Sequence, residues 1–140
     1  MGVVQPHHRR FDAAVVIRDA LSERVPDAVV ELGRDATYRP EQFVTVVQTP
    51  TVSALGAVPG QRWAFEVSLR MDTSGPVTSN VLDVHDAVAE AVLSLDDWRD
   101  FRFSSVVCRA EPTVMASHNP TGAAMVGSTY SLILRRINNG

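Results

Sequence analysis

Hydrophobic side chains along residues 62–72 follow the two-residue period of a β-strand. In the stretch RWAFEVSLRMD, five large apolar residues alternate with small or polar ones: Trp63, Phe65, Val67, Leu69 and Met71. Such alternation puts the apolar set on one face of a strand and Glu66, Ser68 and Arg70 on the other. The sequence therefore predicts a long strand with one face on a core and the other open to water or to a partner.

Two other segments have a helical period. Asp12 can cap a first helix that runs to about Val25, and Pro26 ends it. A turn at residues 72–79 leads to a second helix, with Ser79 or Asn80 as its cap. Its apolar side carries Val81, Val84, Val88, Val92 and Leu95. Its opposite side carries Asp83, Asp86 and Glu90, so this acidic stripe must face away from the core.

The remaining apolar runs predict strands at residues 28–32, 43–49, 103–111 with a continuation at 113–117, and 125–137. The element order is then α-β-β-β-α-β-β. This order predicts an α+β fold with two layers, in which a mostly antiparallel sheet of four to five strands has two helices on one face. We expect a single domain over residues 1–140, with residues 1–10 as a flexible tail.

Residues 50–61, PTVSALGAVPGQ, differ from the rest of the chain. They contain two prolines, two glycines and no charge, together with Val52, Leu55 and Val58. We interpret this segment, called the arm below, as a long hairpin whose apolar residues have no core of their own to enter. An arm of this kind is expected to lie on a neighbouring subunit.

Three further apolar residues fall outside the predicted core. Val15 lies among the polar residues of the first helix, where it would be exposed in a monomer. Leu82 and Leu93 lie about 100 to 120 degrees from the centre of the apolar side of the second helix, given 3.6 residues per turn. These three residues are candidates for a subunit contact.

Composition and charge narrow the class of protein. Of the 140 residues, 45% are hydrophobic and 21% are charged, which is typical of globular proteins, and the net charge of −3 argues against DNA as a primary ligand. No apolar run approaches the roughly 20 residues that span a bilayer. Residues 1–10 lack the apolar region of a secretory signal, so we expect the chain to stay in the cytoplasm.

Candidate catalytic and metal-binding groups each have a simpler interpretation. His85 is expected at the edge of the apolar side of the second helix, whereas Asp83 and Asp86 point outward. The histidine and the aspartates are then too far apart in direction to act together as an acid-base group. His7 and His8 lack further metal ligands, and His118 lies in a loop with no nucleophile motif. The sequence GAVPG lacks the spacing of a phosphate loop. We therefore expect no catalytic residue, no cofactor and no metal site.

Cys108 and Trp98 are interpreted as structural residues. Cys108 is the one cysteine of the chain, and we expect it to be a small buried hydrophobe. Trp98 lies in an acidic turn at residues 96–100, where its indole needs both burial and a hydrogen-bond acceptor. It can belong either to the core or to an interface.

The chain resembles the tail terminator proteins of long-tailed bacteriophages. The resemblance covers nearly the whole chain and rests on the first helix, the arm, the strand WAFEVSLRMDT, the helix NVLDVHDAVAEAVLSL and the closing HNPTGAAMVGSTYSLILRRI. It is a likeness of element order and style, without a catalytic signature. The absence of lysine among thirteen basic residues suits a phage of a GC-rich host.

The resemblance implies a structural, non-enzymatic virion protein at the junction of tail and neck, assembled in the host cytoplasm. Such proteins form a ring, usually of six copies, that caps the tail tube, ends its polymerisation and joins a head-completion or connector protein. Ring contacts would then involve Val15, Val52, Leu55, Val58, Leu82 and Leu93. Glu66, Ser68 and Arg70 would contact the tube or the neck. Asp83, Asp86 and Glu90 would line a lumen through which DNA passes without specific binding.

Two other functions remain open at this point. Another neck component, such as a head-completion or connector protein, has a similar size and also forms rings. A small-molecule-binding α+β domain or an enzyme would need polar residues that converge in an apolar pocket. The sequence shows no such set of residues.

Overall fold

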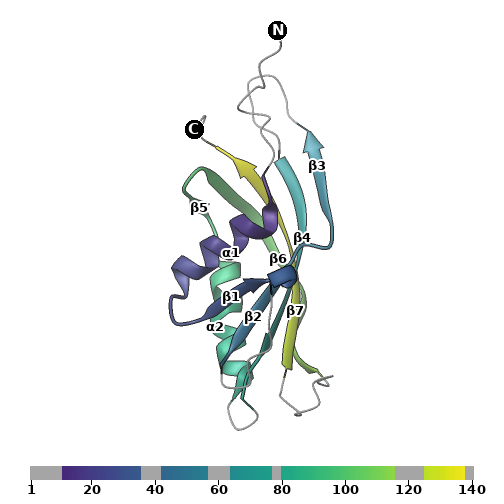
Figure 1. The fold of residues 1–140 in the computed structure, drawn as a ribbon. Helices are drawn as coiled ribbons and strands as arrows, with labels where there is room; N and C mark the ends of the chain where they lie inside the picture. Colours follow the sequence, from purple (N-terminus) through teal and green to yellow (C-terminus); the bar gives the residue numbers. More distant parts are fainter. Residues whose placement is uncertain (1–10, 36–41, 57–63, 77–79, 116–124, 138–140) are drawn as a thin grey trace.

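A computed structural model describes residues 11–35, 42–56, 64–76, 80–115 and 125–137 of the protein (Figure 1). It contains two α-helices, α1 (Ala13–Arg24) and α2 (Val81–Leu93), and a short 3-10 helix, η2 (Gly33–Asp35). The strands are β1 (Val29–Leu32), β2 (Val44–Gln48), β3 (Val52–Gly56), β4 (Ala64–Ser74), β5 (Asp97–Trp98), β6 (Phe101–Met115) and β7 (Met125–Arg136).

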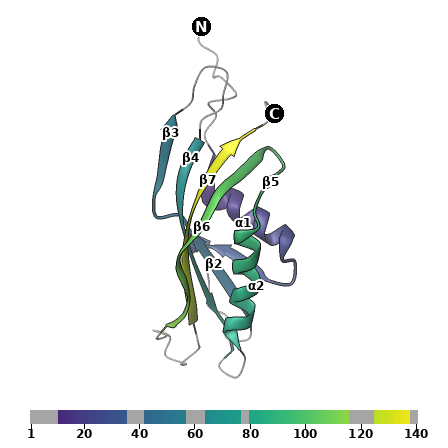
Figure 2. The same cartoon turned by 180° about the vertical axis from the view of Figure 1, so that it is seen from behind.

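The strands form one mixed sheet in the order β1-β2-β4-β7-β6-β5. All neighbours are antiparallel except β1 and β2, which are parallel. Strands β4 and β7 pair in register from Ala64↔Arg135 to Ser74↔Met125 and form the long centre of the sheet. The sheet is tall, narrow and curved, as the two opposite views show (Figures 1 and 2).

Strands β2 and β3 follow one another along the same edge of β4. Strand β2 pairs with the end of β4, as in Gln48↔Arg70, and β3 pairs with its beginning, as in Val52↔Val67. Residue 52 follows residue 48 by four positions, whereas their partners on β4, residues 67 and 70, are three positions apart. The chain from β2 to β3 thus contains one extra residue, next to Pro50. Beyond this kink the hairpin of β3 and β4 extends away from the helices (Figure 2).

Both helices cover the same side of the sheet (Figures 1 and 2). The side chain of Asp12 caps α1 by accepting hydrogen bonds from the backbone N–H groups of Ala14 and Val15. Asn80 caps α2 in the same way through the N–H of Leu82. Both caps agree with the sequence, which offered Asp12 for the first helix and Ser79 or Asn80 for the second.

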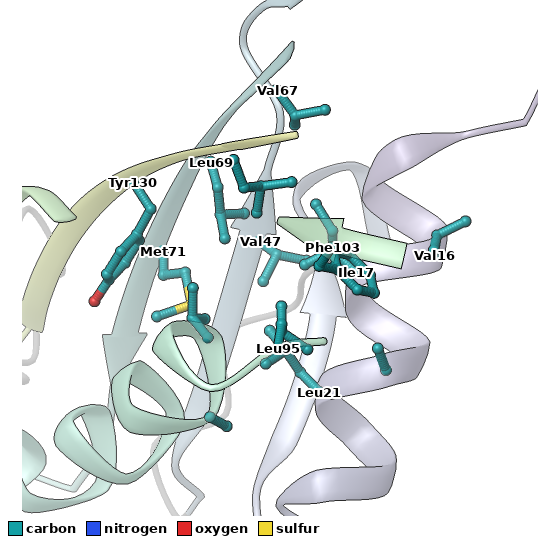
Figure 3. Close-up of a cluster of buried hydrophobic side chains, with 14 of the residues drawn as sticks. Val16, Ile17, Leu21, Val47, Val67, Leu69, Met71, Leu95, Phe103 and Tyr130 are labelled. Atoms are coloured by element: carbon teal, nitrogen blue, oxygen red, sulfur yellow. The ribbon is translucent and has the colours of Figure 1, made fainter. Parts of the chain in front are cut away.

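The core lies between this helical layer and the inner face of the sheet (Figure 3). Ile17 and Leu21 of α1 and Val67, Leu69 and Met71 of β4 are almost completely buried. Burying an aliphatic side chain of this size contributes about 1.5 to 3 kcal/mol. The predicted alternation is therefore confirmed at Val67, Leu69 and Met71. Phe65 is only half-buried, the preceding Ala64 is buried, and Trp63 lies outside the described residues.

The α+β class, the two helices and the mostly antiparallel sheet are confirmed, but the predicted strand count of four to five is too low. The arm contributes β3, and the acidic turn contains the two-residue β5. Strand β6 begins at Phe101 and is one strand through Pro112 to Met115, with three shifts in its register to β7. Such short or irregular strands leave little period in the sequence to detect.

Candidate assembly surface

The described part of the arm is an exposed strand. Residues 52–55 of β3 are all exposed, and Gly56 is half-buried. Val52 keeps 46% and Leu55 keeps 52% of its surface in contact with solvent. A bulge between Ala54 and Gly56 interrupts the pairing with β4, and Gly56 has a positive φ of 84° that suits glycine. Val58 lies outside the described residues.

A second exposed apolar site lies at the end of α2. Leu93 is 50% exposed, whereas Leu82 near the start of the helix is half-buried. Their positions away from the centre of the apolar side agree with the prediction that the sheet cannot bury them fully. The arm and α2 lie at well-separated places on the molecule (Figures 1 and 2). The arm and the end of α2 therefore each present an exposed apolar site, and the two sites do not form one continuous surface.

Val15 does not lie on such a patch. It is half-buried and packs against the core cluster, in contrast to the exposure expected for a monomer. The buried residues of α1 are Ala13, Val16, Ile17, Ala20 and Leu21, and Val15 packs only at the border of the core. Val15 consequently contributes to the stability of the fold and offers less free surface than expected.

The side of the sheet away from the helices carries the polar residues of β4. Glu66 and Ser68 are exposed, and Arg70 is half-buried. The Arg70 guanidinium donates two hydrogen bonds, of 2.9 and 3.0 Å, to the carboxylate of Asp72. Next to Glu66, residues of β6 and β7 complete a pit of about 200 Å³, among them Val107, Arg109 and Ser131.

The acidic residues of α2 are exposed as predicted: Asp83, Asp86 and Glu90. They occupy the outer side of the helix, opposite the residues that enter the core. Glu90 also borders an open depression of about 590 Å³ between the ends of the two helices, which Arg24 and the small residues Ala87 and Ala91 line as well. This depression is not an apolar enclosure of the kind that a small-molecule site requires.

Two exposed apolar residues on β6 have no counterpart in the sequence prediction. Val107 is 43% exposed and Val114 is 64% exposed. Ser105 has a positive φ of 51°, and between Ser104 and Val107 three steps of β6 oppose two steps of β7. This bulge reverses the faces of the residues that follow it. An alternation read from the sequence cannot reveal such a reversal.

A chain of buried polar groups connects α2 with the sheet, and here the expected position of His85 is wrong. The His85 ring is fully buried rather than at the edge of the apolar side. Its Nδ1 lies 2.8 Å from Thr73 Oγ1, and its Nε2 lies 2.7 Å from Ser128 Oγ. Thr73 Oγ1 in turn lies 2.7 Å from Thr45 Oγ1, and the Ser128 hydroxyl donates a 2.9 Å hydrogen bond to Tyr130 Oη.

The hydrogen bonds fix the proton on the ring. Because Ser128 uses its one proton toward Tyr130, it can only accept from His85, so Nε2 carries the hydrogen and Nδ1 accepts from Thr73. Burial lowers the pKa of His85 below its usual 6.5, against the opposing effects of Asp86 and Asp72. The neutral ring is thus satisfied on both nitrogens and closed to solvent. This is the arrangement of a structural histidine.

The sequence contains one feature that could have revealed this network, namely small hydroxyl residues at inward positions of apolar strands. Thr45, Thr73 and Ser128 all occupy inward positions and are buried. A buried hydroxyl requires a partner, so three of them at inward positions indicate a polar side chain between them. The histidine at the edge of the predicted apolar side is that side chain.

Trp98 and Cys108 take intermediate positions. Trp98 is half-buried, stacks on Phe101 and donates its indole N–H to the carboxylate of Glu23, with the Arg99 guanidinium 4.6 Å from the ring centre. Its ring belongs to the border of the core. Cys108 is half-buried and packs against the core, less deeply than expected.

Within the residues that the structure describes, no three His, Cys, Asp or Glu side chains gather as a metal site. Over the same part of the chain, neither helix has the length and apolar character that crossing a membrane demands. Comparison of the sequence with protein-family models gives no match, and comparison with curated proteins gives no significant relative. The function must therefore be argued from the surfaces themselves.

Proposed function

We propose that this protein is a structural subunit that assembles with copies of itself into a ring, as the terminator at the end of a phage tail tube. The exposed arm carries this proposal. Val52 and Leu55 are about half exposed on a strand with no charged residue. Exposure of an uncharged apolar segment to water is unfavourable, and covering it with another surface lowers the free energy.

The arrangement of the patches supports a ring. Head-to-tail contacts close a ring only when each subunit has two unlike surfaces that fit one another. The arm supplies one surface and Leu93, with part of Leu82, supplies the other. Because the two lie at separate places on the subunit, one copy can contact a neighbour on each side (Figure 1).

The polar surfaces fit the remaining contacts of a terminator. The open sheet face with Glu66, Ser68 and Arg70 is available for the tail tube protein or for a head-completion or connector protein. Asp83, Asp86 and Glu90 are exposed together on α2. If this stripe faces the lumen, its negative charge repels the DNA phosphates and lets DNA pass without binding.

The proposal can be tested on tail tubes. Purified protein is added to growing tubes, which are then viewed by electron microscopy and measured for length. The proposal expects a ring at one end of each tube and an end to growth. Rings that bind heads but leave tube growth unchanged would indicate another neck component instead. Protein that stays monomeric and ignores both tubes and heads would contradict an assembly role.

A further inference from the structure

Four strands have an outer edge in the described residues: β1, β3, the two-residue β5 and the part of β6 beyond it. Of these edges, β3 has the least protection against pairing with another chain. Strand β1 is short and carries Glu31. Beyond β5, the edge of β6 contains three irregularities in register, the charges of Arg109 and Glu111, and Pro112, which has no N–H. Bulges, charges and proline are the usual means of blocking an edge.

Strand β3 has much less of this protection. It has one neighbour among the described strands, β4, and it carries no charge over its five residues. Pro50 precedes the strand, and the single bulge comes at its end, after Ala54. Residues 52–54 thus form a regular, uncharged and exposed edge.

The register shows which backbone groups point away from β4. The N–H of Ser68 donates to the carbonyl of Thr51 at 2.9 Å, so these opposite residues form a hydrogen-bonded pair. In an antiparallel ladder such pairs alternate with pairs that share no hydrogen bond. Val52↔Val67 and Ala54↔Phe65 are therefore of the second kind. The N–H and C=O groups of Val52 and Ala54 consequently face outward.

The outward N–H and C=O groups of β3 can form hydrogen bonds with the same groups of a second copy. If two β3 strands lie antiparallel about a two-fold axis through Ser53, Val52 stands opposite the partner's Ala54 and Ala54 stands opposite the partner's Val52. Two such pairs provide about four backbone hydrogen bonds. No like charges meet at the axis, because the strand has none. The pairing also places another strand beside the exposed side chain of Val52.

From this geometry we infer that the free protein pairs through β3 with a second copy of itself, which joins the two sheets into one continuous sheet. The inference goes beyond the proposed function. A two-fold contact uses the same patch on both subunits, whereas a head-to-tail ring needs unlike patches. The β3 contact therefore belongs to the free protein, and a copy that enters a ring releases it so that the arm can lie on a neighbour.

A disulfide at the two-fold axis tests this pairing. In a Cys108→Ala background, which removes the one native thiol, Ser53→Cys places the new thiol opposite its copy. The two residues form a pair without hydrogen bonds, with Cα atoms about 4.5 Å apart, which a disulfide can bridge. Gln48→Cys, exposed on β2, is the matched control for random collision. Circular dichroism verifies that both variants are folded.

Pairing through β3 predicts about ten-fold more disulfide-linked dimer for Ser53→Cys than for Gln48→Cys after mild oxidation, because paired strands keep the thiols at high effective concentration. Equal amounts from both variants would overturn the inference. So would a disulfide that forms only when Ser53→Cys is mixed with Val107→Cys, since this would indicate head-to-tail pairing of β3 with β6.

The capping assay on tail tubes separates this inference from the proposed function. A dimer linked through residue 53, together with wild-type protein that does not stop tube growth, would contradict the terminator role alone. Capping by wild-type protein without an excess of the Ser53→Cys dimer would contradict the β3 pairing alone.

Discussion

His85 on α2 donates a 2.7 Å hydrogen bond to Ser128 on β7, and both side chains are closed to solvent. Together with the bond between His85 and Thr73 of β4, it fixes α2 to two neighbouring strands at one place. A satisfied hydrogen bond contributes about 0.5 to 1.5 kcal/mol, but a buried group that loses its partner costs about 1 to 3 kcal/mol. The network therefore specifies the position of the helix more strongly than its net energy implies.

Replacement of Ser128 by alanine should destabilise the subunit. The change leaves the Nε2–H of His85 without an acceptor in a site that excludes water, so we expect a loss of about 1 to 3 kcal/mol in the free energy of unfolding. Urea denaturation measures this loss. Ser131→Ala on the same strand is the control, because Ser131 is half-buried and its partner Arg109 is exposed. A similar loss in both variants would argue against a special role for the network.

The same histidine makes stability depend on pH. The pKa of His85 is lowered in the folded protein by burial, so the unfolded chain binds the proton more readily. The contribution of the neutral ring to the free energy of unfolding is complete above 6.5, the pKa of histidine in the unfolded chain. It is lost as the pH falls through the lower pKa of His85 in the folded protein. Denaturation between about pH 5 and pH 7 should therefore show stability rising with pH.

A variant without this ring separates its contribution from other titrations. His85→Asn should have lower stability but a flatter pH dependence over that range. The lowered pKa of Asp97, caused mainly by its hydrogen bond to Arg102, acts below 3.8 and leaves this window unaffected. An unchanged slope in His85→Asn would rule out the histidine as its source.

The N-terminal cap of α1 gives a test of local helix stability. Asp12 accepts hydrogen bonds from the N–H groups of Ala14 and Val15, at 3.0 and 3.4 Å, and forms a 3.2 Å ion pair with Arg34. Asp12→Ala should cost about 0.5 to 2 kcal/mol in unfolding free energy. Asp12→Asn keeps the cap and loses only an exposed ion pair, worth about 0 to 1 kcal/mol. Equal losses would show that the charge, rather than the cap, stabilises the helix.

Leu93 tests the second surface of the proposed ring. Because it is 50% exposed, Leu93→Asp should change the stability of the subunit by about 0.5 kcal/mol or less. It should abolish capping of tail tubes but leave the disulfide through Ser53→Cys intact. Ala87→Asp places the same charge at another exposed position of α2 and should retain capping. Normal capping by Leu93→Asp would remove this residue from the ring contact.

Much of the fold follows from local patterns in the sequence. The alternation along β4 and the helical period of α2 each arise from burial of one face, so the sequence predicts both elements and the exposure of Leu93. The caps at Asp12 and Asn80 also follow from local chemistry. The predicted sites on the arm, the open sheet face and the acidic side of α2 remain predictions until assembly is measured.

The parts that the sequence does not predict depend on contacts between distant segments. The burial of His85 results from its meeting with Thr73 and Ser128, which belong to two different strands. The exposure of Val107 results from a bulge at Ser105, a residue with no sequence signal for positive φ. The half-burial of Val15 results from its packing against the core cluster, although it lies outside the buried side of α1. None of these features follows from the hydrophobic pattern within a single segment of the sequence.

The central claim, that copies of this chain cover the exposed arm, is tested most directly by the mass of the free protein in solution. Light scattering should give a multiple of the 15.3 kDa subunit for the wild type and 15.3 kDa for Leu55→Asp, with identical circular dichroism spectra. The added carboxylate opposes burial of the arm but leaves an exposed residue exposed in the monomer. A wild-type mass of 15.3 kDa at all concentrations, or an oligomer that Leu55→Asp does not affect, would contradict the account.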